Sequence, residues 1–364
     1  MEHGQGTLAH LLGALPQPHL WAGHSVFLTG HTGFKGSWLM VWLKELGADV
    51  TGYSLPPDPN SLGERLGHGG AGLGDIRDAG ALKAAMQAAS PRIVFHLAAQ
   101  ALVRRSYVDP LETFATNVMG TAHVLDAVRA TPSVQAVVVI TTDKCYENRE
   151  WPWPYRETDA LGGRDPYSAS KAGSELVTAC WRRSFLTDKG VGVASARAGN
   201  VFGGGDWSTN RLVPDCVKAF IDGSTVRIRS PHATRPWQHV LDPLCGYLLL
   251  AERLLAGETV DEAWNFGPGI DEVRPVSEVV SMLARYWGKG ADWAIDGGIH
   301  PHEAALLSVD AAKARARLGW RPRLCLTEGL QITVQWYQKH HAGVAARSLV
   351  LENLEHYTRW SEHD

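Results

Sequence analysis

Cysteine is scarce in this sequence, and so are the features that would indicate a membrane or nucleic-acid partner. The five cysteines (Cys145, Cys180, Cys216, Cys245 and Cys325) are scattered, and no CxxC pair occurs. We therefore expect reduced thiols in a cytoplasmic protein, with no disulfide framework and no metal site. No run of about 18 apolar residues is present, which argues against a membrane-spanning helix. A net charge of −3 provides no attraction for nucleic acid or a membrane surface.

The N-terminal residues 1–22 lack the basic start of a signal peptide, and Pro16 and Pro18 interrupt their apolar part. We expect an N-terminal extension there. Internal repeats and low-complexity tracts are also absent. The 364 residues, 45% of them hydrophobic, are enough for one large domain or two.

The sequence does contain a regular alternation of short apolar runs and helical segments. The expected strands are 25–29, 49–53, 93–97, 136–140 and 192–197, and the expected helices are 36–46, 81–89, 111–129, 165–183 and 241–255. Repeated β-α-β units of this kind predict an α/β fold with a Rossmann doubly wound parallel sheet, covered by helices on both faces.

The pattern changes at Ala198, where glycine and proline begin to punctuate the chain. Apart from helix 241–255, the residues up to about 341 look irregular and are rich in Trp, His and Arg. We therefore expect a dinucleotide-binding Rossmann domain of residues 23–197 and about 240–264. A smaller, discontinuous α/β substrate-binding domain would contain residues 198–239 and about 265–364.

A glycine-rich turn, Gly30-His31-Thr32-Gly33-Phe34-Lys35-Gly36, directly follows the first expected strand and opens a helix. Glycines let the backbone turn sharply and approach a pyrophosphate, and the helix N-terminus offers free N–H groups. The G-x-x-G-x-x-G spacing in this context predicts a dinucleotide site formed by Gly30, Thr32, Gly33, Phe34, Lys35 and Gly36. The alternative is a glycine-rich turn without a ligand.

The second expected strand ends in neither an acidic residue, which would favour NAD, nor an arginine, which would favour NADP. Ser54 stands there, and its uncharged hydroxyl favours NAD. Asp75 and Ile76 are candidates to hold the adenine, although Asp75 could equally be a helix cap or a turn aspartate.

Tyr167 and Lys171 form a Y-x-x-x-K pattern, which places both side chains on one face of a helix. An ammonium near a phenol lowers the phenol's pKa and suits it to act as a general base. Alone, this pattern also occurs by chance on a surface helix.

Several motifs together resemble the extended short-chain dehydrogenase/reductase family, over roughly residues 23–336. They are TGxxGxxG, HLAAQ (96–100), NVMGT (117–121), TTDKCYEN (141–148), YSASK (167–171), RAGNVFG (197–203), TRPWQHVLD (234–242) and NFGPG (265–269). The resemblance implies an NAD cofactor that also contacts Leu97, Ala98 and Ala99. It further implies a homodimer formed through helices 111–129 and 165–183.

Longer motifs, including TGHTGFKGSWL, TTDKCYEN and GNVFGGGDW, resemble the branch of this family that dehydrates CDP-glucose. This implies a lyase that recycles NAD⁺: transient oxidation at C4, loss of water across C5 and C6, and hydride return to C6. The product would be CDP-4-keto-6-deoxy-D-glucose. Within one fold, the alternatives are an epimerase or a 4,6-dehydratase of a UDP-, GDP- or dTDP-hexose. A dinucleotide-sensing regulator is the non-enzyme alternative.

The resemblance also implies roles for the catalytic residues. Tyr167 would take the O4 proton, while Lys171 would lower the pKa of Tyr167 and hold the nicotinamide ribose. Thr142 would orient O4, and Asp143 would protonate the departing C6 hydroxyl. An epimerase needs no such acid.

Lys144 is the unusual residue, because dehydratases of other nucleotide sugars carry glutamate there as the C5 base. As a neutral amine it could be that base, or as a cation it could stabilise an enolate. It could instead pair with a surface carboxylate such as Glu147 or Asp159.

Substrate contacts are expected from Asn200, Arg211 and Arg235, because a pyrophosphate suits arginine. Each of the three could instead be structural.

Overall fold

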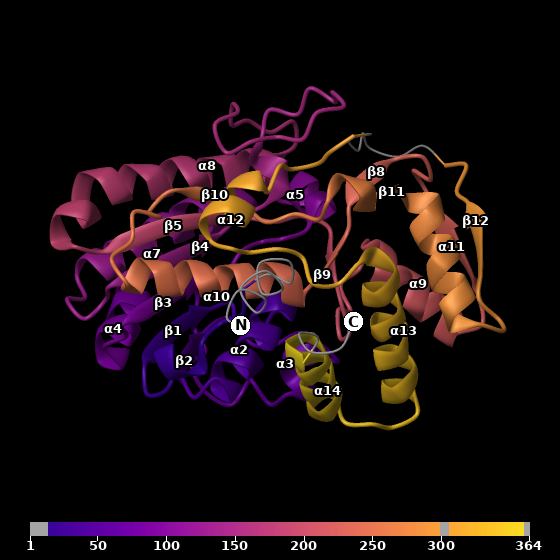
Figure 1. The fold of residues 1–364 in the computed structure, drawn as a ribbon, viewed down its shortest axis with the longest axis horizontal. Helices are drawn as coiled ribbons and strands as arrows, with labels where there is room; N and C mark the ends of the chain where they lie inside the picture. The colour runs from indigo at the N-terminus through magenta and orange to yellow at the C-terminus, as the bar shows by residue number, and fades with distance from the viewer. Residues whose placement is uncertain (1–13, 299–305, 360–364) are drawn as a thin grey trace, which may run out of the picture.

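The computed structural model describes residues 14–298 and 306–359, and its centre is a six-stranded parallel sheet (Figure 1). The strands are β1 (Ser25–Thr29), β2 (Asp49–Tyr53), β3 (Ile93–His96), β4 (Ala136–Ile140), β5 (Gly192–Arg197) and β10 (Ala263–Asn265). Their order is β10-β5-β4-β3-β1-β2. All strands are parallel, but from β1 the chain first adds β2 on one side and then β3 and the later strands on the other, as in a doubly wound Rossmann sheet. The predicted fold class is confirmed.

Helices cover both faces of this sheet (Figure 1). One face carries α2 (Phe34–Glu45) and α10 (Leu241–Leu255), and the other carries α4 (Ala79–Ala89), α7 (Gly120–Arg129) and α8 (Pro166–Trp181). Successive strand residues point to opposite faces. Val26 and Leu28 of β1 therefore join one core, whereas Phe27 joins the other. Burial of both faces explains why the strands are apolar throughout.

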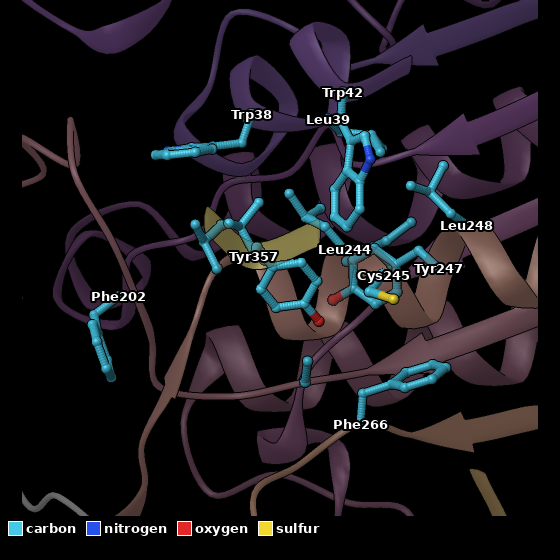
Figure 2. Packing of buried hydrophobic residues seen from close by; sticks show 14 of the residues in the cluster. Trp38, Leu39, Trp42, Phe202, Leu244, Cys245, Tyr247, Leu248, Phe266 and Tyr357 are labelled. Atoms are coloured by element: carbon cyan, nitrogen blue, oxygen red, sulfur yellow. The ribbon is translucent and has the colours of Figure 1, made fainter. Parts of the chain in front are cut away.

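The core on the α2 side is rich in large aromatic residues (Figure 2). Trp42 of α2 points toward α10 and the C-terminal helix α14 (Ala346–Arg359), whereas Trp38 donates through Nε1 to the Gly204 carbonyl. Trp42 packs edge-on against Tyr357 of α14, with ring centroids 5.6 Å apart. This contact fixes the last described helix on the first helix of the Rossmann sheet.

Smaller paired strands lie beside the main sheet. The pairs are β6 (Val201–Phe202) with β9 (Gln238–His239), β7 (Thr225–Ile228) with β12 (Asp292–Ile295), and β8 (Thr234–Pro236) with β11 (Val273–Pro275). The nearby helices are α9 (Leu212–Ile221), α11 (Val276–Trp287) and α13 (Leu326–His341). These elements come from two stretches of chain. The domain bounds given above stay a prediction.

The expectation of irregular structure up to about residue 341 was wrong. α9, α11 and α13 are regular helices, and α11 buries Val279, Val280 and Leu283 on one face. Its apolar residues recur at helical spacing, but flanking glycines and prolines hid this period. Towards the C-terminus, α12 (Ala312–Arg317) contacts β10, and α14 also contacts α3 (Leu62–Arg65).

The two long helices expected at 111–129 and 165–183 contain π-helical turns. The first consists of α6 (Pro110–Phe114), the π turn Ala115–Met119 and α7, and α5 (Val103–Val108) precedes it. The second is α8 followed by the π turn Arg182–Leu186.

Part of the predicted N-terminal extension, residues 1–13, lies outside the described residues. Next comes the short 3₁₀ turn Pro18–Leu20. Trp21 is fully buried, and its Nε1 donates a hydrogen bond to Glu252 of α10 at 2.7 Å. This contact fastens residues 14–22 to the Rossmann sheet.

Over the described ranges, no helix has both the length and the apolarity to span a bilayer. The same ranges contain no cluster of three or more His, Cys, Asp or Glu side chains suited to hold a metal ion.

One prediction arises from His239 on β9, which lies between the rings of Trp38 and Phe202. Burial lowers the pKa of His239 to about 3. Below pH 6.5 the unfolded chain binds a proton here that the folded protein does not, so stability falls as the pH falls. His239→Gln should reduce the loss of unfolding free energy between pH 6.5 and 5 by up to about 2 kcal/mol.

Urea unfolding at the two pH values measures this loss. The exposed His341 supplies the control variant His341→Gln, which should keep the parental pH dependence. An unchanged loss in His239→Gln would contradict the assignment.

Candidate active site

A single cleft of about 1750 Å³ lies at the carboxyl ends of the strands, and almost all predicted site residues line it. The lining includes Gly30, Thr32, Gly33, Phe34, Lys35, Gly36, Ser54, Asp75, Ile76, Leu97, Ala98, Ala99, Thr142, Lys144, Tyr167, Lys171, Asn200, Arg211 and Arg235. Asp143 is fully buried and lies directly behind this wall. The cleft also includes side chains from α9, β7 and β8.

The glycine turn between β1 and α2 has the geometry of a phosphate cradle. Gly30 has φ +76°, and a Cβ on it would lie 2.6 Å from the Ala98 nitrogen. A Cβ on Gly36 would clash with the Gly30 carbonyl. Gly33 caps α2 without any side-chain hydrogen bond, which leaves the first N–H groups of the helix available to an anion.

The end of β2 adds a polar pair beside this turn. The hydroxyl oxygens of Thr32 and Ser54 lie 2.6 Å apart, and Thr32 also donates to the Leu55 carbonyl. Neither side chain brings a positive charge that would bind a 2′-phosphate.

Asp75 lies in the turn before α4 but does not cap that helix, because Asp78 does so. Arg77 Nη2 donates to Asp75 Oδ2 at 2.5 Å. This hydrogen bond lowers the pKa of Asp75 below its usual value. The structure thus shows a turn aspartate at the edge of the cleft that is paired with Arg77.

Tyr167 and Lys171 are both on α8, one turn apart, and both face the cleft. Asp165 caps α8 by accepting a hydrogen bond from the Ser168 N–H at 2.9 Å. Burial lowers the pKa of Lys171 to about 8, and its Nζ donates to the Ile140 carbonyl at the end of β4. The Y-x-x-x-K pattern is therefore at the site and not on an outer surface.

The Tyr167 phenol is buried in the wall of the cleft. Burial raises the pKa of Tyr167 to about 12, and Thr142 and Arg211 oppose this effect. The Lys171 ammonium donates to the main chain at the end of β4, and its effect on the phenol stays a prediction. A positive charge from a bound ligand would further favour the phenolate.

Residues 142–144 follow β4 and form a short polar turn. Thr142 Oγ1 donates to Asp143 Oδ1 at 3.0 Å, and Lys144 Nζ donates to the same oxygen at 3.2 Å. Asp143 Oδ2 is buried and has no hydrogen-bond partner among the described residues. The turn therefore holds one carboxylate between a hydroxyl and an ammonium.

The alternative that Lys144 pairs with a surface carboxylate is not supported. Its Nζ contacts Asp143, whereas Glu147 pairs with Arg149. Asp159 accepts a hydrogen bond from the Arg156 N–H.

Gly199 is a residue that the sequence argument missed. A Cβ at this position would clash with the Asp143 carboxyl group, so glycine is required for that side chain to keep its place. The signal was present in the GNVFGGGDW motif, but the crossing of two chain segments was not visible in it.

We predict that Gly199→Ala lowers kcat by about 10²-fold, because it displaces the Asp143 carboxyl group, which the sequence predicts to be a general acid. Steady-state turnover of the substrate measures this effect. The control is Gly269→Ala, since a Cβ on Gly269 would meet nothing within 4 Å. Equal activity of the two variants would contradict the role given to Gly199.

The predicted substrate residues surround the other half of the cleft. Arg211 Nη1 donates to Asp206 Oδ2 at 3.1 Å, and Arg235 Nη1 donates to the Thr234 carbonyl. Asn200 has φ +47°, and its buried Nδ2 has no hydrogen-bond partner in residues 14–298 or 306–359. Asp206, which the sequence argument also missed, holds Arg211 in place.

Lys35 of the glycine turn lies near this cationic group. Burial lowers the pKa of Lys35 to about 7, and the charges of Arg211 and Lys171 act in the same direction. Cationic side chains thus gather on this side of the cleft, which favours an anionic ligand.

Comparison with known proteins identifies the family of this chain. Residues 27–333 match the family model described as GDP-mannose 4,6 dehydratase. The CDP-glucose 4,6-dehydratase of Salmonella typhimurium is 49% identical over 88% of this chain and 92% of that protein. The dTDP-glucose 4,6-dehydratase of Streptomyces griseus is 30% identical over 87% of this chain and 95% of that protein.

Solved structures show the same fold. DesIV, a dTDP-glucose 4,6-dehydratase from Streptomyces venezuelae with NAD and TYD bound, has a TM-score of 0.74 and 26% identity, covering 87% of this chain and 98% of that chain. A UDP-glucose 4-epimerase from Thermotoga maritima with UDP-glucose has a TM-score of 0.76 and 25% identity, covering 87% of this chain and 99% of that chain. The family match and the 49% identical relative show that this chain belongs to the GDP-mannose 4,6 dehydratase family, within the NAD-dependent epimerases and dehydratases.

Proposed function

We propose that this protein is a CDP-D-glucose 4,6-dehydratase, a hydro-lyase that forms CDP-4-keto-6-deoxy-D-glucose. The observation that carries the proposal is the placement of residues 142–144 and of Tyr167 and Lys171 around one cleft. The relative at 49% identity, a CDP-glucose 4,6-dehydratase, supports the choice of substrate.

The cofactor in this proposal is NAD. The glycine cradle, the open N-terminus of α2 and the uncharged pair of Thr32 and Ser54 all fit its pyrophosphate and adenosine. Related structures hold NAD as well. When bound, NAD supplies the hydride acceptor for C4, the hydride donor for C6 and a positive charge.

In the first half of the reaction, Tyr167 accepts the proton of the O4 hydroxyl. Thr142 orients O4, since its hydroxyl is in contact with the phenol of Tyr167. Lys171 lies on the same face of α8 as Tyr167 and donates to the Ile140 carbonyl at the end of β4, and its ammonium can bind a ribose hydroxyl there. Oxidation of C4 makes the C5 hydrogen acidic, because it is then α to a carbonyl.

In the second half, Asp143 and Lys144 act on C5 and C6. Asp143 delivers a proton to the C6 hydroxyl as it leaves. Lys144 is in contact with Asp143 at 3.2 Å. Once it has passed its own proton to Asp143, it removes the C5 proton as a neutral amine; otherwise, as an ammonium, it stabilises the enolate that forms when water takes that proton. This pair is the reason to prefer a dehydratase over an epimerase, which returns the hydride to C4 and needs no leaving group at C6.

The nucleotide-sugar pyrophosphate would lie between Lys35, Asn200, Arg211 and Arg235. The orphaned Nδ2 of Asn200 gives it a free donor for a phosphate or sugar oxygen. In this proposal the substrate lies between the Rossmann sheet and the elements α9, β7 and β8, which is consistent with the two-domain division predicted from the sequence.

The assembly in this proposal is a homodimer. Exposed apolar side chains lie on the helices that the family resemblance assigns to the interface, namely Leu111, Met119 and Leu176, which are 52% to 81% exposed. A patch of this kind is typical of a protein contact. The cysteines that are unpaired thiols fit a reducing, cytoplasmic location.

A dinucleotide-sensing regulator remains the non-enzyme rival. It would have no use for a tyrosine and a lysine aligned in the cleft beside an acid. Turnover of any nucleotide sugar excludes this rival.

A donor panel tests the substrate claim. The purified protein is incubated with NAD⁺ and CDP-, UDP-, GDP- or dTDP-glucose, or with GDP-mannose, and the 4-keto product is measured. We expect product from CDP-glucose at the highest kcat/KM. Product from another donor alone would overturn the substrate, and a C4 epimer would overturn the reaction.

A further inference from the structure

A buried ion pair lies directly behind the catalytic residues, and the mechanism above does not use it. Glu175 is on α8, four residues after Lys171 and eight after Tyr167, so the three side chains lie along one face. Its partner Arg197 ends β5, and the two side chains are each only 3% exposed. Burial of a charged pair needs several good contacts to compensate for lost hydration.

The hydrogen bonds of the Glu175 carboxylate connect α8 to the end of β4 and to β5, the two strands next to the catalytic turn. Oε1 accepts from the Thr141 hydroxyl at 2.5 Å, immediately before Thr142. Oε2 accepts from Ser195 Oγ at 2.7 Å and from Arg197 Nη2 at 2.8 Å, both on β5. These polar contacts lie beside the apolar core that the sheet forms with α4, α7 and α8.

Arg197 extends the network to the far end of the catalytic turn. Its Nη1 donates to the Tyr146 hydroxyl at 2.8 Å, and that hydroxyl donates to Asn265 Oδ1 at 2.7 Å. The turn that carries Asp143 and Lys144 is therefore held at both ends, through Thr141 and through Tyr146.

The pair also sets the charge near the reacting groups. Although burial alone would raise it, the Arg197 charge and three hydrogen bonds hold the pKa of Glu175 below its usual value. The resulting carboxylate opposes the effect of burial on Lys171, whose pKa burial lowers to about 8.

We propose that the ion pair between Glu175 and Arg197 is a positioning device for the reaction: it fixes the catalytic turn against α8 and places a carboxylate one helical turn from Lys171. Glu175 and Arg197 touch no reacting atom in this assignment. The inference rests on the proposed function for its kinetic test, and a second test needs no substrate.

The kinetic test compares three variants over a pH range. Glu175→Gln removes the negative charge, so Lys171 should lose its proton at a lower pH. The pH at which kcat/KM falls on the alkaline side of its pH profile should therefore decrease by about one pH unit. The kcat of Glu175→Gln at pH 7 should fall about tenfold. Glu175→Asp keeps the charge, so it should lower kcat without changing the pH at which kcat/KM falls on the alkaline side. Arg197→Lys keeps the cation but cannot reach both partners, and should behave like Glu175→Asp.

The second test titrates Lys171 itself. The rate at which acetic anhydride modifies Lys171, read by peptide mass spectrometry as a function of pH, should have a lower midpoint in Glu175→Gln than in the parent. Glu258→Gln is the matched control, because it breaks the exposed pair with Arg253, and it should change neither readout.

The outcomes separate the two claims. If the parent is inactive but the midpoint pH of Lys171 modification is lower in Glu175→Gln than in the parent, the proposed function is overturned and the inference is kept. An active parent whose Glu175→Gln variant keeps the parental pH profile and midpoint would overturn the inference. If Glu175→Gln does not fold, as circular dichroism would show, Glu175→Asp and Arg197→Lys decide: parental kcat in both overturns the positioning role.

Discussion

Replacing Tyr167 by phenylalanine is expected to lower kcat between about 10²- and 10⁴-fold, the range that a positioned general base contributes. The phenol is the buried group that faces the cleft beside Thr142, and the ring itself packs in the wall. Removing only the hydroxyl should leave the ring packing and NAD binding unchanged. The measurement is steady-state turnover of CDP-glucose together with the dissociation constant for NAD⁺.

Tyr286→Phe is the matched control. Within the described residues, the Tyr286 hydroxyl has one hydrogen bond, which it accepts from the neighbouring Arg285. This variant should keep parental kcat. A Tyr167→Phe variant within a factor of about three of the parent, well outside the range for a general base, would mean that another group takes the O4 proton.

Lys144→Ala is the second change with a large expected effect, about 10²-fold on kcat. Lys144 stands where the resemblance to dehydratases of other nucleotide sugars leads us to expect glutamate. Its ammonium lies 3.2 Å from Asp143. Without it, both the removal of the C5 proton and the support of Asp143 should be lost. Product formation and the exchange of the C5 hydrogen with D₂O are measured side by side.

Exchange at C5 should slow with product formation in Lys144→Ala, because both need the same proton transfer. The exposed Lys339, which pairs with Glu352, provides the control Lys339→Ala with parental values. Turnover and exchange at parental rates in Lys144→Ala would remove Lys144 from the elimination altogether.

Much of the fold could be predicted because burial on both sheet faces leaves a strong signal. Strands 49–53, 136–140 and 192–197 and helix 241–255 have the predicted bounds. α11 and α13, of 12 and 16 residues, were missed because the glycines and prolines around them were taken as signs of irregular structure.

The site was predictable where a motif fixes spacing, and unpredictable where separate chain segments meet. The glycine turn and the pair of Tyr167 and Lys171 line the cleft as predicted. The contact of Lys144 with Asp143 depends on the 3₁₀ turn after β4, and the need for Gly199 depends on where Asp143 packs. Neither follows from spacing along the chain.

The central claim is an oxidation, elimination and reduction within one active site, and an isotope transfer tests it most directly. CDP-glucose carrying deuterium at C4 is converted in ordinary water, and the product is analysed by NMR and mass spectrometry. The account predicts that the deuterium appears in the C6 methyl group, while C5 takes its hydrogen from the solvent. Deuterium that is lost to solvent, or kept at C4 in an epimerised sugar, would contradict it.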